Sequence, residues 1–166
     1  LFDLLRSSSG TAILAVGVFL VLLSGGIDVS CTTLAIVGQY ISVNVLIATG
    51  IDNIAFAFLI SILVGVTLGA INAVFVSIFN LPTLIVTLGT SSLYHGLMLE
   101  FVGTKAVNVG GLPQSIKDFG ALNVLKIARP DGSEFGLSVF FVILVIILLI
   151  TWFILKFTMI GRGIYA

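Results

Sequence analysis

The chain has 166 residues, of which 59% are hydrophobic and only 8% are charged, and its formal net charge is zero. Soluble domains carry roughly 25% charged residues, so this composition excludes an ordinary soluble domain and indicates an integral membrane protein. The balanced charge gives no reason to expect a nucleic acid or an acidic protein as a partner. The single cysteine, Cys31, cannot form a disulfide within the chain.

Four stretches without charged residues, 7–27, 29–51, 53–99 and 135–155, set the number of membrane spans. A helix needs about 20 apolar residues to cross the bilayer core, so the third stretch holds two spans and each of the others holds one. The sequence therefore predicts an all-α integral membrane protein with about five transmembrane helices. We place the spans near residues 11–24, 31–48, 54–79, 83–102 and 135–157, with one long polar loop at 103–134.

The most informative stretch is the interruption between the first two spans, residues 24–30 (SGGIDVS). Inside a bilayer the backbone groups of such a break need partners within the protein or in a wet cavity. A carboxylate at membrane depth usually faces the bundle interior, and glycine-interrupted segments point to a transporter's pathway. The apolar run that precedes the break, residues 11–24, is short for a full crossing, which is consistent with a glycine pair inside the membrane. We expect a helix break with a positive φ at one of the two glycines, and we assign five residues to the translocation pathway: Ser24, Gly25, Gly26, Asp28 and Ser30.

Asp28 has two interpretations. Its carboxylate could hydrogen-bond the hydroxyl groups of a sugar in the pathway. Alternatively it is structural, because Asp28 and Ser30 are both good N-cap residues for a helix that restarts near Cys31. We favour the structural role, since capping by itself accounts for the residue type and its place.

Two later spans carry small or polar residues at helical spacing. Ser61, Gly65, Gly69 and Ala73 recur every fourth residue and form a ridge against which another helix can pack closely. Pro82 ends the third span, and hydroxyl groups follow along one face of the fourth. Such hydroxyls more often join helices than contact a ligand. Six residues are candidates for lining the pathway: Gln39, Asn44, Asn72, Thr87, Thr90 and Ser91.

The sequence gives little support to catalysis. Ser91 and His95 are four residues apart on one helix, but nothing supplies a third orienting group or an oxyanion hole. A glycine-rich phosphate loop is missing from the sequence, so we do not expect this chain to bind ATP. Cysteine, histidine and carboxylate residues do not occur at metal-ligand spacing. We therefore expect no enzyme, no cofactor and no metal site.

Several motifs, in their order along the chain, resemble the ribose-type permease subunits of bacterial ABC importers, within the branched-chain amino acid and sugar superfamily. The motifs are residues 12–17 (AILAVG), 24–30 (SGGIDVS), 81–90 (LPTLIVTLGT) and 161–166 (GRGIYA). The chain departs from the family pattern at residues 31–33 and at His95. The resemblance implies a multi-pass protein of the bacterial plasma membrane that forms the pathway of a sugar importer. It also implies three partners: a second permease subunit, a cytoplasmic ABC ATPase and an extracytoplasmic solute-binding protein.

Within this family, residues 1–166 would form about half of a permease, so we expect a fragment that lacks the first span and the C-terminal part. The family's ATPase-docking helix would follow Ala166, and we therefore expect this chain to insert into membranes without stimulating the ATPase. The family order also places Leu1 and the loop 103–134 outside the cell and residues 80–82 inside. The positive-inside rule disagrees, because this loop holds four of the seven basic residues.

The ligand and the mode of transport stay open at the level of sequence. A simple sugar, a nucleoside or another small polar molecule would suit the same residues. The alternative functions are a membrane carrier outside the ABC class, for which Asp28 is the one acid available at mid-membrane depth, and a membrane-embedded enzyme or scaffold.

Overall fold

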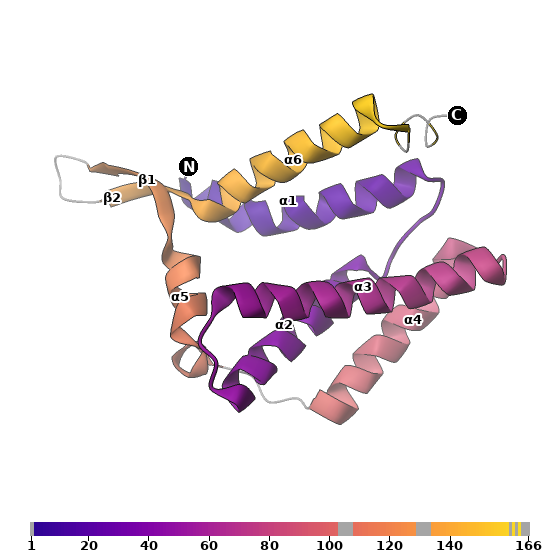
Figure 1. Cartoon of the computed structure of the whole chain (residues 1–166), viewed down its shortest axis with the longest axis horizontal. Helices are drawn as coiled ribbons and strands as arrows, with labels where there is room; N and C mark the ends of the chain where they lie inside the picture. Colours follow the sequence, from indigo (N-terminus) through magenta and orange to yellow (C-terminus); the bar gives the residue numbers. More distant parts are fainter. Residues whose placement is uncertain (1, 103–107, 129–133, 160, 162, 164–166) are drawn as a thin grey trace. The chain divides into compact units, whose positions relative to one another are not determined.

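The computed structural model describes residues 2–102, 108–128, 134–159, 161 and 163 and consists mostly of helices (Figure 1). Among these residues, four helices are long and apolar enough to cross a membrane. This confirms the predicted class of an α-helical membrane protein. The elements in chain order are α1 (Phe2–Leu23), α2 (Cys31–Thr49), α3 (Ile54–Ile78), α4 (Thr83–Leu97), a π-helical turn (Met98–Val102), a 3-10 turn (Val109–Gly111), α5 (Gln114–Ala121), β1 (Asn123–Ala128), β2 (Glu134–Ser138) and α6 (Val139–Phe157).

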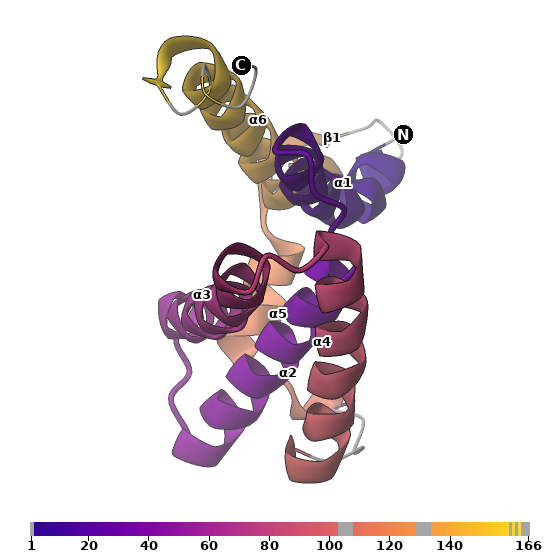
Figure 2. The ribbon, with the colours of Figure 1, turned by 90° about the vertical axis from the view of Figure 1, so that its right-hand side faces the viewer.

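The chain divides into two compact units, and the division falls inside the predicted break, between Gly25 and Gly26. The first unit comprises Leu1–Gly25 and Phe119–Ala166, and in it α1 packs along α6 while β2 contacts both helices (Figure 1). The second unit comprises Gly26–Asp118, and in it α2, α3 and α4 contact one another (Figure 2). The candidate pathway residues after the break therefore all belong to the second unit.

The helix α1 begins earlier than the sequence indicates. The predicted first span covers residues 11–24, whereas the helix runs over 22 residues from Phe2 to Leu23. Two serines in its first turns stay helical because their hydroxyls donate to carbonyls of the preceding turn, Ser7 to Leu4 and Ser9 to Leu5. At about 1.5 Å per residue, such a helix can cross the hydrocarbon core by itself. The first span is therefore longer than predicted, and the position of the glycine pair inside the membrane stays a prediction.

The boundary between α3 and α4 lies where the sequence predicts it. α3 ends at Ile78, Asn80 adopts a left-handed conformation with φ 52°, and α4 begins at Thr83 directly after Pro82. The helix α4 has only 15 residues, and the π-helical turn extends it to Val102. α4 is thus too short to count among the four membrane-crossing helices, and the predicted crossing over residues 83–102 stays a prediction.

The predicted loop 103–134 contains more regular structure than expected. It holds the short helix α5 and the antiparallel pairing of β1 with β2. β2 also takes up the first residues of the predicted last span, so α6 begins at Val139 and not at residue 135. Ser138 ends the strand and caps the helix, because its hydroxyl accepts a hydrogen bond from the Phe140 N–H at 3.4 Å.

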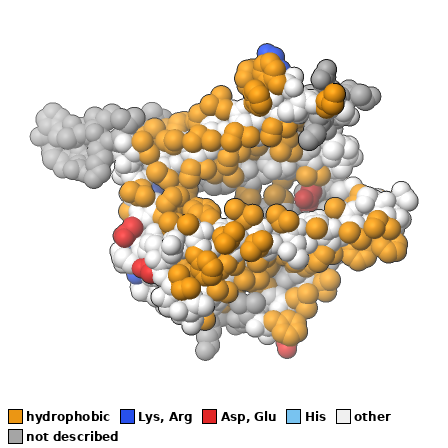
Figure 3. Space-filling view, viewed as in Figure 1, with side chains coloured by type: hydrophobic (Ala, Val, Ile, Leu, Met, Phe, Trp, Pro, Cys, Tyr) orange, Lys and Arg blue, Asp and Glu red, His pale blue; other side chains and the backbone are white. Residues whose placement is uncertain are grey.

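Apolar side chains dominate the face of the helices shown in Figure 3, and charged side chains are sparse there. Of the membrane-crossing windows, those of α1, α3 and α6 are each only 6% buried, whereas that of α2 is 28% buried. Side chains exposed in this way face lipid or other helices in a membrane. The small apolar core lies mainly where α2, α3 and α4 meet and consists of Val37, Val43, Leu46, Ala57, Val86 and Tyr94.

Candidate functional site

The segment between α1 and α2 is a true helix break. The last turn of α1 closes with hydrogen bonds from Ser24 N–H to Val21 O at 3.1 Å and from Gly25 N–H to Leu22 O at 3.0 Å. Gly25 then adopts φ 83°, a left-handed conformation that glycine reaches without steric penalty. The prediction of a positive φ at one of the two glycines is confirmed at Gly25.

The Asp28 carboxylate forms a local turn at the end of the break by binding Ser30, two residues further along the chain. One oxygen, Oδ1, accepts hydrogen bonds from the Ser30 backbone N–H and from the Ser30 hydroxyl, both at 2.7 Å. Ser30 stands at the N-cap position of α2, but its side chain makes no capping bond to the helix. The two residues thus stabilise a local turn ahead of α2, which differs in detail from the predicted side-chain capping of its first N–H groups.

Asn72 of α3 connects this turn to the rest of the second unit. Its side-chain amide donates to the Ser30 hydroxyl at 2.9 Å, and its carbonyl oxygen accepts from the Tyr94 hydroxyl of α4 at 3.2 Å. The Tyr94 hydroxyl also lies 3.2 Å from the Leu68 carbonyl. Ser30, Asn72 and Tyr94 are all buried. We call the four side chains Asp28, Ser30, Asn72 and Tyr94 the polar chain, because each is hydrogen-bonded to the next.

Thr87 of α4 supports the backbone of the break from the other side. Its hydroxyl accepts a hydrogen bond from the Val29 N–H at 3.2 Å and can donate to the Ile27 carbonyl at 3.3 Å. Thr87 is only 2% exposed. One buried hydroxyl therefore satisfies two backbone groups that have left regular helix, as the environment of a membrane requires.

A second pair of hydroxyls joins α2 to α4. Thr33 Oγ1 and Ser91 Oγ lie 2.6 Å apart, and either can be the donor. Ser91 therefore binds a neighbouring helix, whereas the side chain of His95 on α4 is exposed. Thr33 and Tyr94 were not among the residues predicted from the sequence. A signal for Tyr94 was available, since it continues the helical spacing of Thr83, Thr87 and Thr90.

The remaining candidates do not join the polar chain. Gln39 is exposed on α2, the Asn44 amide donates to the Tyr40 carbonyl at 2.8 Å, and the Thr90 hydroxyl donates to the Val86 carbonyl at 2.9 Å. Asn44 and Thr90 thus bind within their own helices. Ser24 is likewise exposed and bonds back to α1.

The predicted small-residue ridge meets α2 at two of its four positions. The Ser61 hydroxyl donates to the Gly38 carbonyl at 3.2 Å, and a Cβ added to Gly38 would lie 3.4 Å from the Ser61 carbonyl oxygen. A Cβ added to Gly69 would lie 3.9 Å from Leu34. Gly65 has open space beside it and Ala73 is exposed. Gly38 of α2, which is not part of the predicted ridge, is the glycine that approaches the facing helix most closely between α2 and α3.

Within the described part of the chain, no group of at least three histidine, cysteine, aspartate or glutamate side chains could hold a metal ion. The arrangement instead connects the broken segment to α3 and α4 through the buried polar side chains of Asn72 and Thr87. Such breaks occur in membrane proteins where the backbone is buried in protein or lines a cavity. The fold and site thus define a multi-pass helical membrane protein with a polar centre at a helix break.

The chain belongs to the family described as "Branched-chain amino acid transport system / permease component", whose model matches residues 1–166. It is a multi-pass protein of the bacterial inner membrane. This family is one of transporter permeases, as the ordered motifs predicted.

Individual relatives cover almost the whole chain. It is 31% identical over 159 residues to the "D-allose transport system permease protein AlsC" of Escherichia coli (strain K12), which is 96% of this chain and 45% of AlsC. It is 33% identical over 158 residues to the "Autoinducer 2 import system permease protein LsrD" of the same strain, which is 92% of this chain and 44% of LsrD. The chain therefore spans about half the length of the curated relatives it matches. No solved structure matches the chain.

Proposed function

We propose that the chain is part of the transmembrane permease subunit of an ABC importer for a simple sugar. The observation that carries the proposal is the match of the permease family over all 166 residues. The names of two relatives, which describe transport of D-allose and import of autoinducer 2, support a small polar ligand rich in hydroxyl groups. Residues 1–166 would then form a partial permease domain.

In this proposal the break between α1 and α2 faces the translocation pathway. Asp28 is half-buried, and its Oδ1 is engaged by Ser30. Its other oxygen, Oδ2, accepts no hydrogen bond from any residue that the structure describes. A carboxylate can accept about four hydrogen bonds, so Asp28 can organise the turn with one oxygen and receive a ligand hydroxyl on the other. The two interpretations of Asp28 are therefore compatible.

As a pathway subunit the chain performs no chemical step. A separate cytoplasmic ATPase would supply the energy, an extracytoplasmic binding protein would deliver the sugar, and a second permease subunit would complete the pathway. The last span would run inward, which places the loop 103–134 outside the cell. Coupling between the ATPase and the pathway requires a physical contact that biases one state of the permease.

The test is uptake of radiolabelled D-allose and D-ribose by cells that carry the full importer containing this chain, with the ATPase and binding protein expressed alongside. We expect uptake of at least one sugar, and we expect Asp28→Asn to reduce it several-fold while the amount of protein in the membrane stays constant. Ser92→Ala serves as the control, because Ser92 is exposed on α4 and its hydroxyl donates to the Leu88 carbonyl of the same helix. Uptake that persists when the ATPase is omitted would contradict the proposal and favour a carrier outside the ABC class.

A further inference from the structure

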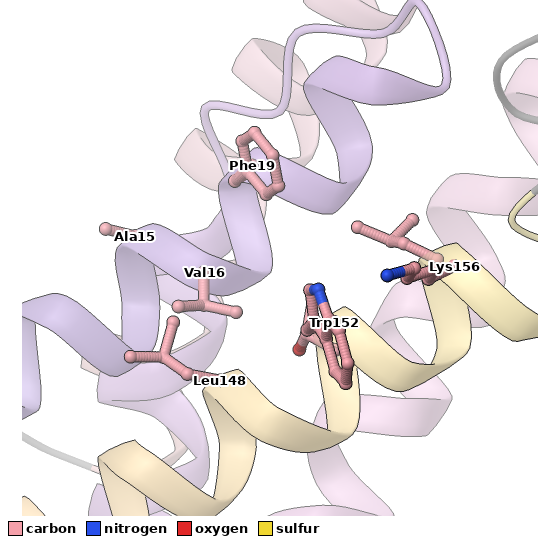
Figure 4. Close-up of a pocket in the computed structure, with 8 residues that line it drawn as sticks. Ala15, Val16, Phe19, Leu148, Trp152 and Lys156 are labelled. Atoms are coloured by element: carbon pink, nitrogen blue, oxygen red, sulfur yellow. The ribbon is translucent and has the colours of Figure 1, made fainter.

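The first unit contains a groove between α1 and α6 whose volume is about 660 Å³ (Figure 4). Val16 of α1 and Leu148 of α6 project into the space between the two helices, and Trp152 stands beside them. The lining is apolar apart from Thr151 and one charged side chain, and consists of Ala15, Val16, Phe19, Leu148, Thr151, Trp152, Leu155 and Lys156. Water would gain few hydrogen bonds in such a groove, whereas a hydrocarbon chain would fill it favourably.

One cation marks the end of the groove. Lys156 is the only charged residue of α6 and lies in its last turn, and its ammonium group sits 5.0 Å from the centroid of the Trp152 ring. In the described part of the chain no carboxylate pairs with it. A tryptophan and a lysine at the end of a membrane-crossing helix are typical of the lipid headgroup region. The groove thus joins an apolar trough to a positive charge in the last turn of α6.

We propose that this groove binds one anionic phospholipid, with an acyl chain along Val16 and Leu148 and the phosphate beside Lys156. The shape and the charge both support this occupant. An uncharged apolar helix would fill the trough but would supply no negative charge to the Lys156 ammonium group. A phospholipid supplies both the hydrocarbon for the trough and the negative charge for Lys156 in one molecule. The inference does not depend on the proposed transport function.

The test uses Trp152, which is the single tryptophan of the chain and lines the groove. The full chain is reconstituted in phosphatidylcholine vesicles, and increasing mole fractions of brominated phosphatidylglycerol or brominated phosphatidylcholine are added as quenchers. A bound anionic lipid predicts that quenching by the phosphatidylglycerol saturates at a low mole fraction. Since one basic residue near the surface contributes about 1 kcal/mol, the preference over brominated phosphatidylcholine should be roughly fivefold.

Two variants separate a site from general attraction to the surface. Lys156→Gln should abolish the preference, whereas Lys117→Gln, which removes the same charge from α5 outside the groove, should preserve it. Val16→Phe should fill the trough and remove the saturable phase for both lipids. Equal quenching by the two lipids in the unsubstituted chain would overturn the proposal. So would a tryptophan that neither lipid quenches, because protein would then cover the groove.

Discussion

The side-chain amide of Asn72 donates a hydrogen bond to the hydroxyl of Ser30 at 2.9 Å, and thereby connects the middle of α3 to the start of α2. These residues are 42 positions apart, and both are buried. Ser30 also binds Asp28, and Asn72 also binds Tyr94. Asn72 is therefore the central member of the polar chain, and several predictions about stability depend on it.

Replacing Asn72 with leucine should destabilise the second unit by roughly 1–2 kcal/mol. Leucine keeps the branched shape of the side chain but leaves the buried hydroxyls of Ser30 and Tyr94 short of a partner, and hydrogen bonds between membrane helices are each worth about 0.6 kcal/mol on average. The free energy of unfolding in mixed detergent micelles measures the effect. Asn44→Leu is the matched control, because Asn44 bonds only to its own helix, and it should change the stability less.

A double-mutant cycle tests whether the polar chain acts as a unit. Tyr94→Phe removes the hydroxyl and keeps the ring, so alone it should lower the free energy of unfolding by about 0.5–1.5 kcal/mol. Combined with Asn72→Leu it should lower that energy by less than the sum of the two single effects, since both substitutions remove the same bond. Strict additivity would show that the two side chains do not interact.

The backbone at Gly25 gives a prediction independent of side-chain contacts. Gly25→Ala forces a residue with a Cβ into φ 83° and should destabilise the protein by about 1–2 kcal/mol, although the space beside Gly25 is open. Gly10→Ala, also next to open space but inside helix α1, should instead be neutral or stabilising by up to about 1 kcal/mol. Thermal unfolding of the two variants side by side makes the comparison. If both alanines behave alike, the left-handed conformation at Gly25 is wrong.

The attachment of α5 should depend on pH. Hydrogen bonding by Ser115, whose backbone N–H donates to Asp52 Oδ1 at 2.8 Å, lowers the pKa of the exposed Asp52 carboxylate from its ordinary value, and the Gln114 N–H contributes. A lowered folded-state pKa means that the contribution to stability is complete above the unfolded pKa, near 4, and is lost as the pH falls through the lower folded value.

Amide hydrogen exchange at Ser115 measures this attachment. Protection should be constant from pH 7 to about pH 5 and should decrease at lower pH, and Asp52→Asn should remove the dependence. Protection that increases on acidification would contradict a lowered pKa of Asp52 in the folded protein.

Cysteine labelling tests the proposed orientation in the membrane. Cys31 is the only cysteine, so Cys31→Ser gives a cysteine-free background. In that background Asn108→Cys, at an exposed position of the loop, should react with an impermeant reagent added outside intact cells. Leu81→Cys, between α3 and α4, should react only after the membrane is opened. The reverse pattern would favour the orientation that the positive-inside rule predicts.

Much of the fold could be predicted from local sequence patterns, and the predictions that failed also have local causes. The break at Gly25 and the boundary at Pro82 were predictable because glycine and proline act on the backbone where they stand. The start of α1 was not, because Ser7 and Ser9 look like helix breakers until their hydroxyls find carbonyls one turn back. The β1–β2 pairing was missed because its short strands carry no clear alternation and lie beside turn residues.

The residues of the candidate site could be predicted from the sequence, but their hydrogen-bond partners could not. Asp28 and Ser30 were predicted as parts of the break and Asn72 and Thr87 as polar residues of later spans, and the structure brings all four together at the break. Thr90 and Asn44 were selected by the same reasoning, yet they bond within their own helices. Only the packing of α2, α3 and α4 decides between these outcomes, and helical spacing in one sequence does not define which faces meet.

The central claim, that this chain belongs to the pathway of an ATP-driven sugar importer, is tested most directly by reconstitution. The full permease containing residues 1–166 is placed in proteoliposomes with its ATPase, and ATP hydrolysis is measured with empty and with sugar-loaded binding protein. We predict that loaded binding protein stimulates hydrolysis several-fold and that the sugar accumulates in step with it. An ATP hydrolysis rate that is the same with empty and with sugar-loaded binding protein, or sugar uptake in the absence of ATP, would contradict the account.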